Sequence, residues 1–113
     1  MIDINSLREF GADVDSGLAR CMNNEAFYLK LVEKSLGDPA FDNLKRAISE
    51  KDLDAAFDAA HGLKGVMGNL ALTPIYDPIV EITELLRSRT DMDYNDLVEV
   101  ICSKKEELSG LCE

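Results

Sequence analysis

The sequence predicts an all-α protein, an antiparallel up-down four-helix bundle with an N-terminal helical extension. Apolar residues recur at helical spacings, β-branched residues are scattered rather than alternating, and no Asn-Gly or Asp-Gly pair joins strand-like runs. A chain of 113 residues is one domain with a single hydrophobic core. We expect residues 1–23 to form the extension and residues 24–113 to form the bundle.

The extension has weak amphipathic turns that Gly11 and Gly17 interrupt. The first bundle helix is predicted near residues 24–50, with Asn24 as a candidate cap. A break or kink is expected at Pro39, since proline disrupts a helix interior. The apolar side of this helix carries Phe27, Tyr28, Leu31, Val32 and Leu36 before the break and Phe41, Leu44, Ala47 and Ile48 after it.

The second bundle helix is predicted over residues 53–71, with Asp52 as its cap. Its apolar residues alternate at spacings of three and four, which is typical of a helix packed in an antiparallel bundle. This seam consists of Leu53, Ala56, Ala60, Leu63, Met67 and Leu70.

Two further helices are predicted, near residues 74–89 and 94–111. Thr73 is the expected cap of the third and Pro74 its first residue, a position at which proline is favoured. The connections are short, so successive helices should be antiparallel neighbours. Their apolar residues are Ile75, Ile79, Ile82 and Leu86 in the third helix and Leu97, Val98, Ile101, Leu108 and Leu111 in the last.

Charge and composition argue against several classes of function. A net charge of −10 disfavours binding to nucleic acid or to an anionic membrane surface. The chain contains neither an apolar run long enough to span a membrane nor a signal-peptide pattern, so we expect a cytoplasmic protein. Three cysteines and a single histidine, without metal-ligand spacing, disfavour a disulfide framework, a zinc site and a haem- or metal-binding bundle.

The single histidine, His61, lies on the second predicted helix. At about 100° per residue it points roughly 130° away from the direction of the apolar seam, so it should face water. Phe57 lies near it in angle one turn before, Lys64 and Gly65 one turn after, and Gly68 two turns after. We therefore expect His61 to project from the helix beside a cation, with almost no side chains beyond it.

Three glycines, Gly62, Gly65 and Gly68, follow the histidine within this helix. Glycine in an exposed helix interior costs about 0.5–1 kcal/mol relative to alanine. One physical gain is access, because a bare surface lets another protein approach the imidazole closely. The alternative is that the helix ends near Gly65 and the glycines act as caps.

The segment of residues 60–70, AHGLKGVMGNL, resembles the signature A-H-x-L-K-G-x-x-x-N-L-G of histidine-containing phosphotransfer (HPt) domains. The resemblance extends from about residue 24 to the C-terminus. One departure is Ala71, which stands where the family often has glycine.

This resemblance implies a phosphorelay intermediate. Nε2 of His61 would attack the acyl phosphate of a receiver aspartate and later pass the phosphoryl group to a second receiver. Lys64 would offset the phosphoryl charge, Gly65 and Gly68 would provide clearance, and Phe57 would contact the docking receiver. The resemblance also implies a phosphoryl carrier rather than an enzyme, with no cofactor of its own, Mg²⁺ held by the receiver, and a monomer that binds receiver domains.

Two alternatives remain at this point. The chain could be the phosphoacceptor domain of a chemotaxis-type histidine kinase, phosphorylated from ATP by a separate kinase domain. It could instead be a helical adaptor that binds proteins without phosphotransfer and is indifferent to the loss of His61. No Walker motif or Gly-rich loop precedes a helix, which argues against an ATP site in the chain itself.

Overall fold

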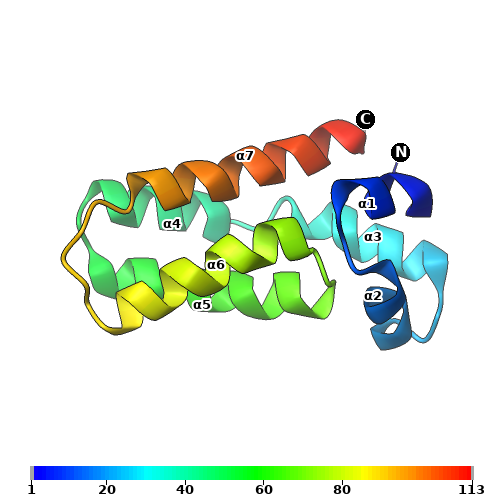
Figure 1. Ribbon diagram of the computed structural model, residues 1–113, viewed down its shortest axis with the longest axis horizontal. Helices are drawn as coiled ribbons and strands as arrows, with labels where there is room; N and C mark the ends of the chain where they lie inside the picture. Colours follow the sequence, from blue (N-terminus) through cyan, green and yellow to red (C-terminus); the bar gives the residue numbers. More distant parts are fainter. Residues whose placement is uncertain (1, 113) are drawn as a thin grey trace.

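The computed structural model describes residues 2–112, which fold into helices joined by turns and short loops and contain no strand (Figure 1). The predicted all-helical class is therefore confirmed. The helices are α1 (Ile4–Phe10), α2 (Val14–Arg20), α3 (Glu25–Ser35), α4 (Ala40–Ser49), α5 (Leu53–Asn69), α6 (Thr73–Arg87) and α7 (Asn95–Leu111).

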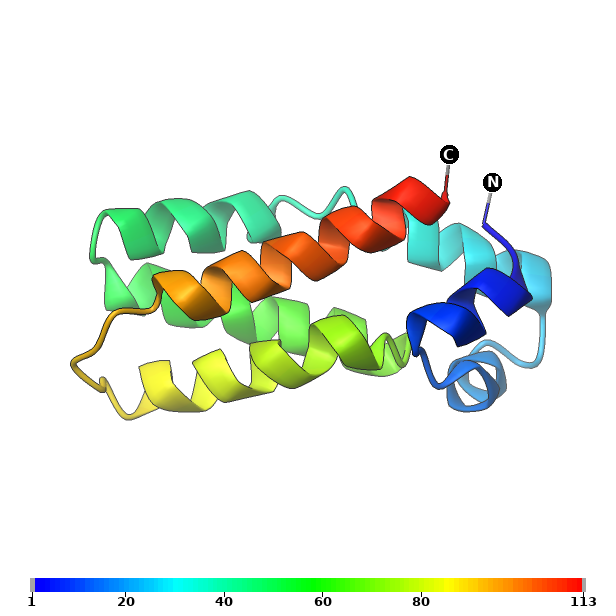
Figure 2. The same cartoon turned by 45° about the horizontal axis from the view of Figure 1, so that its top comes forward.

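Helices α4 to α7 share one apolar interior. Helix α5 packs against α4 and α6, and α7 packs against the same two helices. Figure 2 shows the four running along the long axis of the molecule. Their largest fully buried side chains include Leu44, Leu63, Met67, Ile75, Ile79, Ile82, Ile101 and Leu108. Within residues 2–112, no helix combines the length and the apolar composition that crossing a bilayer requires.

The segment of residues 24–50 forms two helices instead of one kinked helix. Proline lacks an N–H group and disfavours helical geometry in the residue before it, so the helix ends before Pro39. The carboxylate of Asp38 then accepts a hydrogen bond from the Ala40 N–H at 2.9 Å, where α4 begins. Helix α3 contacts α2, at the end of the molecule where α1 also lies (Figure 1). The division of the chain at residue 24 stays a prediction.

Two of the expected helix caps are confirmed and one differs by a residue. The Asn24 side chain accepts from the Phe27 N–H and the Asp52 side chain from the Ala55 N–H, both at 3.1 Å. Helix α6 begins at Thr73 itself, so Thr73 is its first residue and not its cap. Phe27 also departs from the expected apolar face, because it is 43% exposed.

The N-terminal helices attach to backbone carbonyls at the C-terminal end of α5 and in the turn that follows it. The last carbonyls of a helix have no amide partner within that helix and are free to accept other hydrogen bonds. The Arg20 guanidinium donates to the Gly68 carbonyl. The Tyr28 hydroxyl donates to the Leu70 carbonyl at 2.7 Å, and the Asp13 N–H donates to the Ala71 carbonyl at 2.9 Å. These three bonds hold α2 and α3 against the helix that carries His61.

Tyr28 is the centre of this attachment. Its side chain is fully buried, and burial raises the pKa of Tyr28 to about 12, so the hydroxyl stays a neutral donor at physiological pH. A Cβ atom at Gly17 would lie 2.6 Å from three atoms of the Tyr28 side chain. Glycine at this position therefore lets the backbone of α2 lie directly on the tyrosine.

Candidate functional site

The histidine stands on an uninterrupted helix. Helix α5 extends from Leu53 to Asn69 and contains Gly62, Gly65 and Gly68, so the alternative that the helix ends near Gly65 is wrong. His61 is exposed while its neighbours Ala60 and Leu63 are buried, as the periodicity predicts. The buried seam therefore fixes the direction in which the imidazole points.

An aromatic ring supports the imidazole on its own helix. The rings of Phe57 and His61 stack with their centroids 5.7 Å apart and an interplanar angle of 17°. Phe57 is half-buried, and Cζ of Arg87 on α6 lies 5.2 Å from its ring centroid. Arg87 also lies 3.5 Å from Glu84, measured between Nε and the carboxylate. These contacts limit the orientations that the His61 ring can adopt.

His61 opens onto a pocket of about 570 Å³ between α5, the start of α6 and α2. The pocket brings together three of the residues that the resemblance singled out, Lys64, Gly65 and Gly68, whereas Phe57 does not line it. Its other lining residues are Asp13, Ser16, Arg20, Asn69, Ala71, Thr73 and Tyr76.

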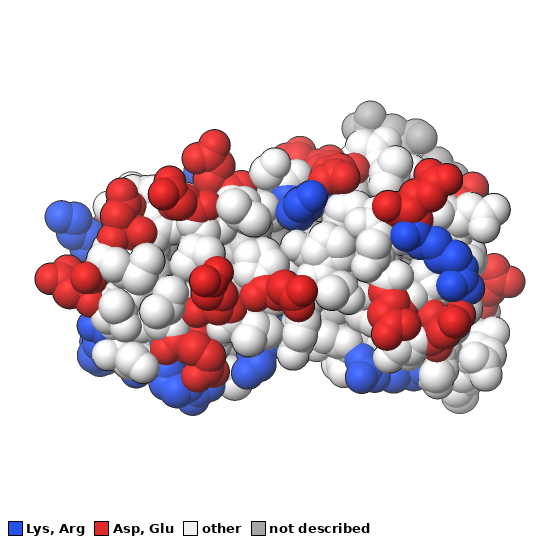
Figure 3. All heavy atoms as spheres, viewed as in Figure 1, with Lys and Arg blue, Asp and Glu red and all other residues white. Residues whose placement is uncertain are grey.

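The pocket carries more positive than negative charge in an acidic protein. Lys64 and Arg20 are its two cations, and neither forms an ion pair with a carboxylate of residues 2–112. Elsewhere acidic groups prevail: the chain has a net charge of −10, and acidic side chains spread across the face that α6 and α7 present in Figure 3. An anionic group is therefore better accommodated in this pocket than on the face of α6 and α7.

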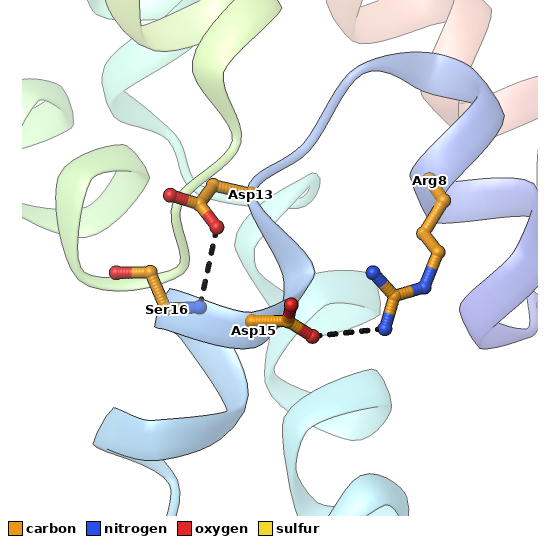
Figure 4. Close-up of polar contacts among 4 residues, drawn as sticks. All are labelled: Arg8, Asp13, Asp15 and Ser16. Atoms are coloured by element: carbon orange, nitrogen blue, oxygen red, sulfur yellow. Dashed lines mark hydrogen bonds and ion pairs between the residues drawn. The ribbon is translucent and has the colours of Figure 1, made fainter.

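Two acidic residues at the start of α2, Asp13 and Asp15, make local contacts (Figure 4). The carboxylate of Asp13, the one carboxylate among the described residues that line the pocket, accepts from the Ser16 N–H at 3.3 Å and caps α2. Its neighbour Asp15 pairs with Arg8 at 2.9 Å. Asp13 therefore reduces the positive potential of the pocket without pairing with either cation.

The glycines beside the histidine differ in their surroundings. A Cβ atom at Gly62 or Gly65 would meet nothing within 4 Å outside its own helix, so the surface there is bare. At Gly68 it would lie 2.9 Å from Cε1 of Tyr76. The surface is thus bare around Gly62 and Gly65, whereas the Tyr76 ring occupies the space beside Gly68, where clearance was expected along with Gly65.

No metal centre is evident among residues 2–112, since no three His, Cys, Asp or Glu side chains gather there. Cys21 is buried, and Cys102 and Cys112 are half-buried. Burial raises the pKa of both half-buried thiols, so they stay protonated at neutral pH. A protonated thiol is a poor metal ligand.

Three residues at or beside the site were not expected from the sequence: Arg20, Tyr76 and Arg87. Arg20 reaches the pocket only because α2 folds back onto the end of α5, and no local motif marks that contact. Tyr76 and Arg87 come from α6, whose apolar seam predicts its buried side but not which flanking side chains meet α5. Tertiary packing, which periodicity alone does not specify, brings all three into place.

Comparison with known proteins gives one match. The family model described as the Hpt domain matches residues 35–112, a segment that includes α4 to α7, His61, Lys64 and Gly65. No curated protein and no solved structure is significantly similar to the chain. Residues 2–34, which include Arg20 and Tyr28, lie outside the match.

Proposed function

The chain belongs to the Hpt domain family, whose members act in histidine phosphotransfer in two-component systems, and on that premise we propose that His61 is its phosphoacceptor. In this proposal His61 accepts a phosphoryl group from a receiver aspartate and passes it to another receiver. The chain acts as a carrier on the antiparallel frame of α4 to α7. The ATP-dependent step and the Mg²⁺ ion belong to its partners.

One observation carries the proposal. The only histidine of the chain stands exposed, within the matched segment, at a pocket whose two cations pair with no carboxylate of residues 2–112. The unprotonated nitrogen of a neutral imidazole is a nucleophile. The bare surface at Gly62 and Gly65 leaves room for a folded partner to bring a phosphorylated side chain to that nitrogen.

The proposed transfer is a displacement at phosphorus. A bond forms between an imidazole nitrogen of His61, by family analogy Nε2, and phosphorus as the bond between phosphorus and the aspartate oxygen breaks. The carboxylate leaves with the electron pair of the broken bond. The other ring nitrogen keeps its proton, so the positive charge on the ring partly offsets the phosphoryl charge. The reverse displacement on a second receiver regenerates neutral His61.

Lys64 is proposed to stabilise the phosphoryl oxygens during this step. It lies one helical turn after His61, lines the same pocket and is half-buried, which limits the screening of its charge by water. We expect Lys64→Ala to slow transfer at saturating receiver by about tenfold. Loss of a donor to the transition state in a closed active site costs more, and Lys64 is only half-buried. The thermal melt should not change, and equal transfer rates for the variant and the wild type would remove Lys64 from the mechanism.

The proposed function is tested with a panel of receiver domains that carry labelled aspartyl phosphate. The label should move to the wild-type chain, be lost in acid and persist in base, and be absent from His61→Gln. Persistence of the label in His61→Gln would contradict the assignment of His61. Failure of every receiver, together with labelling by a kinase and ATP, would favour the phosphoacceptor domain of a kinase. Failure of both would favour the adaptor.

A further inference from the structure

Arg20 is the one pocket cation that lies outside the segment matched by the family model. It is the last residue of α2, and its side chain is exposed. Its guanidinium donates to the Gly68 carbonyl, so the end of the side chain is held against the wall of the pocket. A guanidinium has five N–H donors, and this bond leaves the others available.

The position of Arg20 differs from that of Lys64. Gly68, to which Arg20 is bonded, lies seven residues after His61, about 10 Å along an α-helix. Histidine side chains on a helix lean toward its N-terminus, which increases the separation. Arg20 thus stands at the far end of the pocket from the imidazole and is poorly placed to contact the transferring phosphoryl group.

We propose that Arg20 is a docking residue, which contacts an anionic group on the receiver surface that surrounds the aspartyl phosphate. This inference rests on the proposed function of His61. A receiver site that holds a phosphoryl group beside the carboxylates that bind Mg²⁺ carries several negative charges, which the metal ion offsets only in part. An acidic chain with a net charge of −10 repels such a surface except where cations gather, and Arg20 extends the cationic surface away from Lys64.

Charge at the edge of an interface acts mainly on the rate of encounter. Arg20→Gln should therefore lower the second-order rate of transfer from a receiver by about threefold to tenfold at low salt. The rate at saturating receiver should stay at the wild-type value. The wild-type second-order rate should fall with rising salt, and the variant should show a weaker dependence, so that the two converge at high salt.

Matched variants separate charge from structure. Arg20→Lys keeps the positive charge and should retain most of the encounter rate. Arg46→Gln removes one positive charge from α4, outside the pocket, and should transfer at the wild-type rate. Thermal melts of all three variants report whether loss of the bond to the Gly68 carbonyl loosens α2.

A small phosphodonor provides the second measurement. Phosphoramidate can phosphorylate an accessible imidazole without docking, so Arg20→Gln should be labelled at the wild-type rate. Labelling of wild-type His61 by phosphoramidate together with normal receiver transfer in Arg20→Gln would overturn the role of Arg20 while leaving His61 as phosphoacceptor. Two other results for Arg20→Gln would also overturn the docking role: an equal loss of rate with the receiver and with phosphoramidate, or a loss confined to the rate at saturating receiver. In either case Arg20 would act at the phosphoryl group. If Arg20→Gln does not fold, a salt-independent wild-type rate would overturn the proposal.

Discussion

Two glycines of α5, Gly65 and Gly68, have different surroundings although they lie one helical turn apart. Beside His61, a Cβ atom at Gly65 would point into open space. One turn further on, a Cβ atom at Gly68 would strike the ring of Tyr76, at the end of the helix where Arg20 and Tyr28 attach the N-terminal helices. The same residue type therefore leaves a stretch of the helix bare at Gly65 and makes room for internal packing in the stretch around Gly68.

The difference separates docking from folding. A side chain added in the bare stretch alters what a partner meets and leaves the free protein intact. A side chain added in the packed stretch alters the free protein itself. Gly17, whose added Cβ would lie against Tyr28, belongs with the packed positions although it comes from α2.

The largest effect is expected from a long side chain at the bare position. Gly65→Gln should preserve α5, because glutamine is a good helix former, and the variant should melt later than the wild type. Its side chain would stand one turn from His61, where the proposed function requires a receiver to approach for in-line transfer. Misplacement by about 1 Å can cost on the order of 10² in rate. A variant that is destabilised and transfers normally would show that Gly65 serves folding, contrary to the comparison.

The next largest effect is expected at Gly17, which is buried against Tyr28. Gly17→Ala should lower the free energy of unfolding by about 1–3 kcal/mol, because a methyl group cannot enter without displacing the ring. Denaturant melts measure the loss, and Gly62→Ala, at a bare position, serves as the control and should gain stability. Equal stabilities of Gly17→Ala and the wild type would mean that Tyr28 moves freely, which its complete burial argues against.

The smallest effect is the difference between alanine at Gly65 and alanine at Gly68. Gly65→Ala should raise the free energy of unfolding by about 0.5–1 kcal/mol through helix propensity alone. Gly68→Ala should lower it by about 0.5 kcal/mol, because displacement of Tyr76 outweighs the same gain. In a Tyr76→Ala background the two substitutions should become equally stabilising. A stabilising Gly68→Ala in the wild-type background would show that Tyr76 imposes no constraint.

The sequence predicts α5 well because its apolar seam, its Asp52 cap and its exposed histidine all follow from local rules of spacing and capping. The sequence predicts a break or kink at Pro39, but it does not predict which of the two forms, because the directions of the helices on either side depend on what each packs against. The two classes of glycine could not be told apart, since Tyr76 and Tyr28 reach Gly68 and Gly17 from other helices. The position of Arg20 in the pocket could not be predicted from the sequence for the same reason, because it results from tertiary contacts alone.

In the proposed function, His61 itself carries the phosphoryl group. Trypsin cleaves after Lys51 and Lys64, which releases a peptide of residues 52–64 that contains the only histidine of the chain. After incubation with a phosphorylated receiver and digestion at neutral to basic pH, mass spectrometry should find one added phosphoryl group on this peptide, and acid should remove it. Acid-stable phosphate on Ser or Thr, or acid-labile phosphate on any other peptide, would contradict the account.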